Sequence, residues 1–306
     1  MALPAVFTWA DAPASSVAWP IGGAAVYLVV VAALLRRARR LASASSADVS
    51  GGAAAEATAA AKAARDATNA ADGRANGNGH AHAASTKSTR WGAWRVVLTA
   101  HNVALSLLSL AMLVGAAAGM AARSAREEGG GWHWAVCEHA DHVSAGALDW
   151  VAYVYYLSKF LEFLDTWLAL GKGTVPPHLG LHVFHHATVP AMAWLWLHTA
   201  QSLRFVGLAF NCTVHVVMYA YYALRAAGRP APWWKPYITS LQIVQFATSL
   251  AFAVALFLAV ARGDACAGMP AVYFNLAFNV TLLFQFVGVK KKNARREGGG
   301  GGGGGG

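Results

Sequence analysis

Ionisable and amide side chains occur at helical spacing in four apolar stretches of the chain. The first holds a lysine and two carboxylates at i, i+3 and i+6, on one stripe of a helix: Lys159, Glu162 and Asp165. The second holds three imidazoles at i, i+3 and i+4, which can meet at one patch: His182, His185 and His186. The third and fourth add an imidazole, a phenol and three carboxamides: Asn211, His215, Tyr219, Gln242 and Gln245. Because ionisable groups inside hydrocarbon are costly, each of these positions needs a reason.

This set of groups suits acyl transfer without a metal. An imidazole can act as a nucleophile or as a general base. Glu162 and Asp165 can fix the tautomer of an imidazole and balance its positive charge. Carboxamides are uncharged donors for a thioester carbonyl or an enolate oxygen. Lys159 either neutralises Glu162 or meets an anionic group of the substrate, and the spacing leaves both open.

Two other classes of function remain as alternatives. One is a membrane di-iron desaturase or hydroxylase, which also uses a His-x-x-His-His run. By resemblance to that family, such an enzyme needs about eight histidines in several clusters. Here only one such cluster occurs, although Glu162 and Asp165 are able to serve as ligands. We therefore predict no metal and no other cofactor. The third class is a seven-helix receptor or transporter that uses the polar layer as a ligand site.

The composition identifies the elements that must position these residues. Of the 306 residues, 57% are hydrophobic and only 12% are charged, against about 25% charged in soluble domains. Backbone in lipid must satisfy its own hydrogen bonds, so apolar blocks are expected to be helices. We predict an all-α, multi-pass membrane protein with seven transmembrane helices: Pro20–Leu35, Val96–Ala122, Leu148–Leu170, Leu179–His198, Leu203–Leu224, Tyr237–Ala261 and Pro270–Val289.

The positions of lysine and arginine predict the orientation. Nineteen of the 24 basic residues fall on the side that holds the C-terminus, and four fall on the other side. This asymmetry places the N-terminus in the lumen and the C-terminus in the cytosol. All four polar motifs then lie at one depth, in the cytosolic half of the bilayer, which indicates a single site. The net charge of +10 is expected to face anionic lipid headgroups, and we predict no nucleic-acid partner.

The chain divides into four segments by composition. Residues 1–40 are an N-terminal segment with the first transmembrane helix, and 91–292 are the catalytic helical bundle. Between them, 41–90 is rich in Ala, Ser, Gly and Asn, and we predict a disordered cytosolic loop. Residues 293–306 are predicted to be a disordered Gly-rich tail.

The four motifs together resemble those of the ELO family of very-long-chain fatty acid elongases. The matching runs are Lys159-x-x-Glu162-x-x-Asp165-Thr166, His182-x-x-His185-His186, Asn211-x-x-x-His215-x-x-Met218-Tyr219 and Thr239-x-x-Gln242-x-x-Gln245. His101-Asn102 is also similar to the family. The resemblance covers roughly 95–292, and residues 194–246 look closest to the plant and green-algal branch.

The resemblance implies an acyltransferase of the endoplasmic reticulum membrane, a very-long-chain 3-oxoacyl-CoA synthase. Such an enzyme condenses an acyl-CoA with malonyl-CoA to a 3-oxoacyl-CoA two carbons longer and releases CO₂ and CoA. It implies a ping-pong route with the acyl chain held on His185. Base, orienting and enolate roles would fall to His182, His186 and His215, without individual assignment. A homodimer and association with the other elongation-cycle enzymes stay open.

Basic residues and cysteines outside the motifs give two further expectations. Three cytosolic cations are candidate partners for CoA phosphates: Lys172, Arg225 and Lys235. Cys137 and Cys266 both fall on the lumenal side of the predicted topology, where conditions are oxidising. We predict that these two cysteines form a disulfide. Chain-length preference is not readable, because it depends on which side chains close the acyl tunnel.

Overall fold

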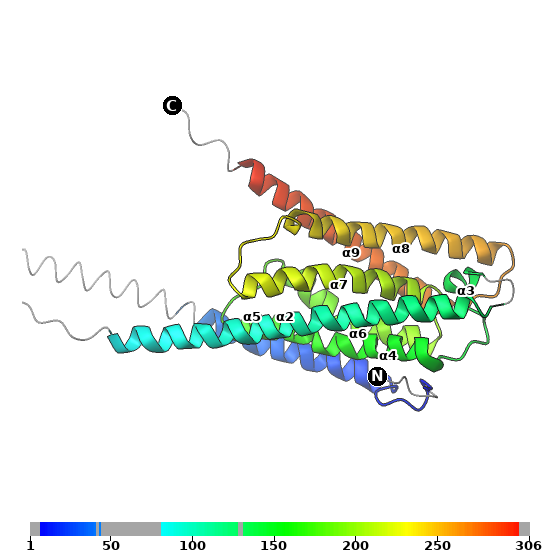
Figure 1. The fold of residues 1–306 in the computed structure, drawn as a ribbon, viewed down its shortest axis with the longest axis horizontal. Helices are drawn as coiled ribbons and strands as arrows, with labels where there is room; N and C mark the ends of the chain where they lie inside the picture. Colours follow the sequence, from blue (N-terminus) through cyan, green and yellow to red (C-terminus); the bar gives the residue numbers. More distant parts are fainter. Residues whose placement is uncertain (1–6, 41–42, 44–80, 128–130, 300–306) are drawn as a thin grey trace, which may run out of the picture.

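The computed structural model describes residues 7–40, 43, 81–127 and 131–299. This part of the chain is a helical bundle whose helices run side by side (Figure 1), with isolated bridges as its only β pairing. The helices are Ala18–Arg40, α2 (Ala81–Ser124), α3 (His133–Val136), α4 (Gly146–Leu161), α5 (Phe163–Gly171), α6 (Leu179–His198), α7 (Arg204–Ala226), the 3₁₀ turn η1 (Lys235–Tyr237), α8 (Ile238–Ala261) and α9 (Met269–Gly299). The all-α prediction is confirmed for the described residues.

Five helices in the described part of the chain are long and apolar enough to cross a membrane. They are Ala18–Arg40, Gly92–Ser124, Arg204–Ala226, Lys235–Ala261 and Met269–Arg295. The other two predicted spans form α4 with α5, and α6. The predicted span Leu148–Leu170 is divided into α4 and α5, and α4, the longer of the two, has only 16 residues. Helix α6 contains the three motif histidines, which make it less apolar. The sixth and seventh spans therefore stay predictions, and so does the orientation of the termini.

The predicted helix Leu148–Leu170 is interrupted, which corrects the expectation of one continuous span. Glu162 lies in a turn between α4 and α5, with φ −65° and ψ −16°. The Asp165 amide bonds the Glu162 carbonyl at 3.1 Å, an i→i+3 bond typical of a tightened turn. The break falls at the centre of the Lys159–Asp165 motif.

Two helices extend beyond the predicted low-complexity boundaries. Helix α2 begins at Ala81, so the last ten residues of the loop predicted for 41–90 are helical. Helix α9 continues to Gly299, into the segment predicted to be disordered from 293. Alanine, lysine and arginine at both ends favour continuation of an existing helix. The rest of the predicted loop, apart from Ser43, and the tail after Gly299 lie outside the described residues.

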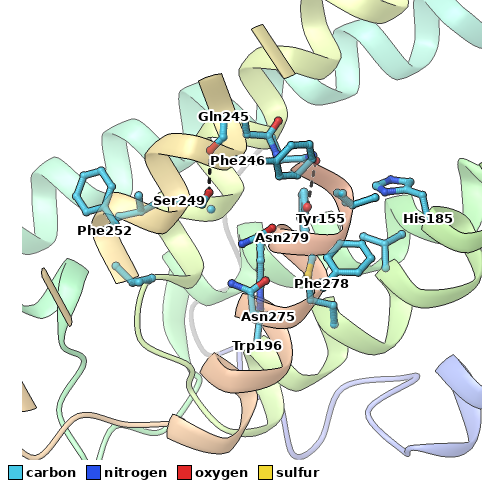
Figure 2. Close-up of a pocket in the computed structure, with 17 residues that line it drawn as sticks. Tyr155, His185, Trp196, Gln245, Phe246, Ser249, Phe252, Asn275, Phe278 and Asn279 are labelled. Atoms are coloured by element: carbon cyan, nitrogen blue, oxygen red, sulfur yellow. Dashed lines mark hydrogen bonds between the residues drawn. The ribbon is translucent and has the colours of Figure 1, made fainter. Parts of the chain in front are cut away.

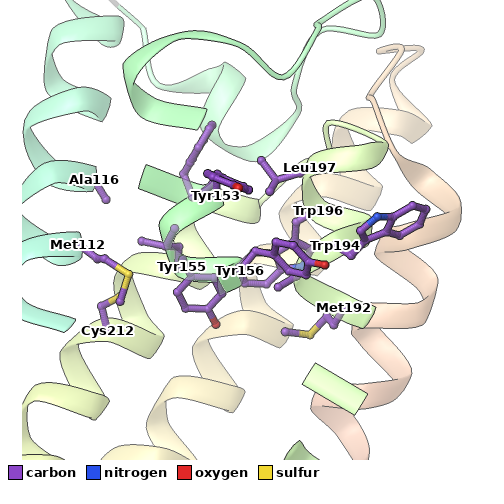
Figure 3. Packing of buried hydrophobic residues seen from close by; sticks show 14 of the residues in the cluster. Met112, Ala116, Tyr153, Tyr155, Tyr156, Met192, Trp194, Trp196, Leu197 and Cys212 are labelled. Carbon is purple, nitrogen blue, oxygen red and sulfur yellow. The ribbon is translucent and has the colours of Figure 1, made fainter. Parts of the chain in front are cut away.

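Aromatic side chains fill the centre of the bundle (Figure 3). Tyr155 of α4 stacks on Trp196 of α6, with ring centroids 5.4 Å apart and planes 5° apart. Helix α2 packs along α7, and α8 packs against α9. The first helix lies against α4 and α5, where Gly23 leaves no room for a Cβ beside the Phe160 ring.

The end of the bundle that holds α3 is closed by a disulfide and by buried charges. Cys137 and Cys266, the pair expected from the sequence, are joined. The buried Arg204 guanidinium lies 3.0 Å from Glu138 and 3.2 Å from Asp149. Arg123 bonds the same Glu138 carboxylate at 2.6 Å. These contacts tie α2, α4 and α7 together at the end opposite to the histidine motif.

Candidate active site

Asp165, at the start of α5, is the centre of one polar network. Its Oδ1 lies 2.7 Å from His101 Nε2 of α2, and its Oδ2 accepts a 2.7 Å hydrogen bond from the Tyr219 hydroxyl of α7. His186 Nε2 of α6 lies 4.0 Å from Oδ2. Four helices thus place one carboxylate among two imidazoles and a phenol.

Glu162 is the centre of a second network. Lys159 Nζ donates a 2.6 Å hydrogen bond to Glu162 Oε1, and His215 Nδ1 lies 3.4 Å from the same oxygen. Lys159 is 1% exposed and Glu162 is 2% exposed. Lys159 also donates to Asn211 Oδ1 at 3.3 Å, and the Tyr155 hydroxyl donates to that oxygen at 3.0 Å. The Asn211 carbonyl is therefore occupied, and only its NH₂ group is left to donate.

The three histidines of α6 lie side by side beside both networks. The rings of His185 and His186 are 5.2 Å apart, and those of His182 and His186 are 5.9 Å apart. His186 is buried, and in the described part of the chain its Nδ1 has no hydrogen-bond partner. His185 is partly buried, and its ring stacks on Phe278 of α9 at 6.0 Å.

A cavity begins at His185 and extends between α6, α7, α8 and α9 (Figure 2). Most of its wall is apolar: Val189, Met192, Leu203, Val206, Phe246, Phe252, Phe278 and Leu282. Its volume is about 40 Å³, enough for a few water molecules. An acyl chain would therefore need these helices to separate slightly. His185 is the only motif histidine among the lining residues of this cavity.

Three of these groups have the geometry to hold a metal ion. One ligand atom each from Glu162, His185 and His186 lies within 4.8 Å of the others. Lys159 already donates to Glu162 Oε1, and a divalent cation beside this ammonium group would be repelled. The donor set therefore suits proton transfer and charge balance better than tight binding of a cation.

The predicted site residues separate into those near the cavity and those away from it. Gln245 lines the cavity with His185. Gln242 instead donates to Met218 Sδ at 3.7 Å. The three candidate phosphate partners lie at the motif end of the bundle: Lys172 just after α5, Arg225 in the last turn of α7, and Lys235 in η1.

Sequence reasoning did not assign two residues of the polar networks to the site. The sequence connects His101 to the site only through its likeness to the family, whereas the structure places its Nε2 2.7 Å from Asp165 Oδ1. Its position in an otherwise apolar block was the signal that identified the other motifs. Tyr155 bonds Asn211, and no sequence signal separates it from the neighbouring core tyrosines Tyr153 and Tyr156.

Comparison with known proteins gives consistent matches. The sequence model of the GNS1/SUR4 family, ELO, matches residues 75–297. "Fatty acid elongase sre1" of Dictyostelium discoideum is 38% identical over 153 residues, 49% of this chain and 54% of that protein. "Fatty acid elongase A" of the same organism is 33% identical over 62% of this chain and 67% of that protein. "Very long chain fatty acid elongase 5" of Tachysurus fulvidraco is 31% identical over 63% of each. The chain spans about half to two thirds of the length of these relatives.

Proposed function

Because this chain belongs to the GNS1/SUR4 (ELO) family, we propose that it is a fatty acid elongase, an acyltransferase of the 3-oxoacyl-CoA synthase type. It condenses a long-chain acyl-CoA with malonyl-CoA and releases CO₂, CoA and a 3-oxoacyl-CoA two carbons longer. The observation that carries the proposal is the position of His185, in the wall of a largely apolar cavity and beside the buried carboxylate of Glu162.

In the first half-reaction His185 is the nucleophile. A ring nitrogen attacks the thioester carbonyl, the carbon–sulfur bond breaks, and CoA leaves as the thiol after it gains a proton. Positive charge develops on the imidazole during the attack. Glu162 lies within 4.8 Å of the imidazole and can balance that charge. The NH₂ group of Asn211, whose carbonyl is already occupied, is a donor for the thioester oxygen.

In the second half-reaction malonyl-CoA loses CO₂, and the enolate carbon attacks the acyl group on His185. The bond from nitrogen to the acyl carbon breaks as the new carbon–carbon bond forms. His182, His186 and His215 remain the candidates for the base, orienting and enolate roles. His215 faces Glu162, and His186 is the nearest imidazole to Asp165 after His101. No step requires a metal or another cofactor.

The substrates approach from the end of the bundle at which α5 ends and α6 begins. Lys172, Arg225 and Lys235 lie at this end and offer cations to the CoA phosphates. We place this end in the cytosol, with seven spans, a lumenal N-terminus and residence in the endoplasmic reticulum membrane. The likeness of 194–246 to the plant and green-algal branch stays a prediction, as do a homodimer and association with the other elongation-cycle enzymes.

The test combines turnover with detection of the acyl-enzyme. Membranes that contain the wild-type chain should incorporate radiolabelled malonyl-CoA into a longer chain in the presence of an acyl-CoA. Purified wild-type protein incubated with acyl-CoA alone should gain the mass of one acyl group. His185→Ala should lose both signals and still insert in the membrane.

His198→Ala is the matched control for this test. His198 is on the same helix, but it stacks on Trp194 at 4.2 Å, at the far end of α6. It should keep both signals. An acyl group trapped on His185→Ala would contradict the nucleophile assignment. A wild-type chain without turnover, with stoichiometric iron in the purified protein, would favour the desaturase alternative.

A further inference from the structure

The cavity beyond His185 contains polar groups that its apolar wall does not satisfy (Figure 2). Four carboxamides and an indole line it: Asn211, whose carbonyl is already occupied, and Gln245, Asn275, Asn279 and Trp196. Within the described residues, the Asn275 side-chain oxygen Oδ1 is buried without a hydrogen-bond partner. The Trp196 indole N–H is buried without a partner in the same part of the chain, and Trp196 is only 3% exposed.

These groups form a strip along the cavity. Asn275 and Asn279 are one turn apart on α9 and share a face. Phe278, which stacks on His185, lies between them in sequence and fixes their depth. An α-helix rises about 1.5 Å per residue, so Asn275 lies about 5 Å from Phe278 along α9. By the same rise, Trp196 lies about 16 Å from His185 along α6. The strip therefore begins close to the nucleophile and continues deep into the cavity.

A saturated hydrocarbon chain cannot pair these groups. An unpaired buried donor or acceptor is unfavourable, because it has lost its bonds to water. A carboxamide offers both an acceptor oxygen and donor hydrogens, and the indole offers a donor. A ketone or an epoxide only accepts, and a carbon–carbon double bond is at most a weak acceptor. A hydroxyl group both donates and accepts, as water does.

We propose that this strip is a subsite for a hydroxyl group in the middle of the acyl chain, so that the enzyme prefers hydroxylated acyl-CoAs. This rests on the proposed function, because it assigns the chain on His185 to this cavity. An extended polypeptide spans at most about 3.6 Å per residue, which has three backbone bonds, so an extended acyl chain should gain about 1.2 Å per bond. A hydroxyl between roughly the fifth and thirteenth carbon would then reach the strip.

The experiment measures kcat/KM for acyl-CoAs of one chain length with the hydroxyl group absent, beside the thioester, in the middle or at the end. The wild-type enzyme should favour the mid-chain hydroxyl over the saturated chain by about tenfold, the effect of one good hydrogen bond. Asn275→Leu and Asn279→Leu remove the amide at nearly constant volume. Each should reduce that ratio several-fold, whichever way the absolute rates move.

Thr281→Val is the matched control, on the same helix. Thr281 is exposed, and among the described residues its hydroxyl bonds only the Ala277 carbonyl, so this variant should keep the ratio. A wild-type ratio near one, with the saturated chain elongated normally, would mean that the strip holds only water and would overturn the proposal. That result leaves the elongase function standing. Failure to elongate any acyl-CoA would instead refute the elongase function itself.

Discussion

Replacing Lys159 tests whether the charges around Glu162 are as tightly coupled as the structure indicates. Lys159→Met keeps most of the side-chain length and removes the ammonium group that donates to Glu162 at 2.6 Å. Both residues are almost completely buried, so water cannot replace the lost partner. Removing one member of a buried pair costs about 3–5 kcal/mol, because the other charge is left uncompensated.

The assay is thermal unfolding of the detergent-solubilised protein, followed by loss of the monodisperse peak in size-exclusion chromatography. For a chain of this size, a loss of 3 kcal/mol lowers the apparent Tm by roughly 10 °C. Adding Glu162→Gln to Lys159→Met removes the carboxylate charge that has lost its partner. This double variant should therefore recover most of the loss of stability. The loss of unfolding free energy in the double variant should therefore differ from the sum of the two single losses by about 2 kcal/mol.

Lys290→Met is the control, because Lys290 is exposed on α9 and its replacement should leave Tm unchanged. An unaltered Tm in Lys159→Met would refute the reasoning, since it would mean that Glu162 is already neutral or reaches water. Activity separates the two roles considered for Lys159. If the lysine only neutralises Glu162, the double variant should keep some binding of an anionic substrate. A specific rise in KM for malonyl-CoA would show that the lysine contacts the substrate.

Three further predictions concern other parts of the bundle. Reduction of the Cys137–Cys266 disulfide should lower the stability by about 2–4 kcal/mol, because a long loop in the unfolded chain is released; an identical Tm with and without reductant would contradict this. Burial alone would raise the pKa of Glu138, but its arginine partners outweigh this effect and hold the pKa below its ordinary value. The stabilising contribution of the Glu138 carboxylate is therefore complete above the ordinary glutamate pKa of roughly 4.3, and it is lost as the pH falls through the lowered pKa of the folded protein. Glu138→Gln should therefore flatten the acid side of a plot of Tm against pH. An unchanged acid side would show that Glu138 does not cause the loss of stability in acid. Tyr219→Phe removes the 2.7 Å bond to Asp165 and should reduce kcat by roughly tenfold with less effect on KM, as measured by malonyl-CoA incorporation; wild-type kcat would show that this bond is not used in catalysis.

The helices that carry the motifs were largely predictable from the sequence. Helix α6 has the predicted bounds, Leu179–His198, and α7 and α8 begin within one residue of the predicted ones. Apolar blocks of this length indicate helices whatever surrounds them, because unpaired backbone is costly in lipid. The break at Glu162 was not predictable, since it depends on partners from α4 and α7 that hold the carboxylate in place.

The pairing of the polar residues was harder to predict than their presence. Spacing identified Asp165 and Tyr219 separately, but only the packing of α2 along α7 shows that His101 and Tyr219 bind the same carboxylate. None of the four motifs includes the cavity-lining amides Asn275 and Asn279. Isolated asparagines in an apolar helix usually bond a neighbouring helix, and sequence does not show whether they face a helix, lipid or a cavity.

The N-terminal segment before the first helix constrains the order in which the chain can assemble. The Trp194 indole N–H donates to the Ser15 carbonyl at 2.7 Å, and the Tyr153 hydroxyl donates to the Pro13 carbonyl at 2.8 Å. Ser15, which is synthesised before α6, therefore gains this partner only after α6 has left the ribosome. Cys137 must wait still longer for Cys266, which precedes the last helix. A nascent chain stalled before α6 should consequently leave residues 13–15 open to protease, and protection of this segment would report completion of the bundle during synthesis.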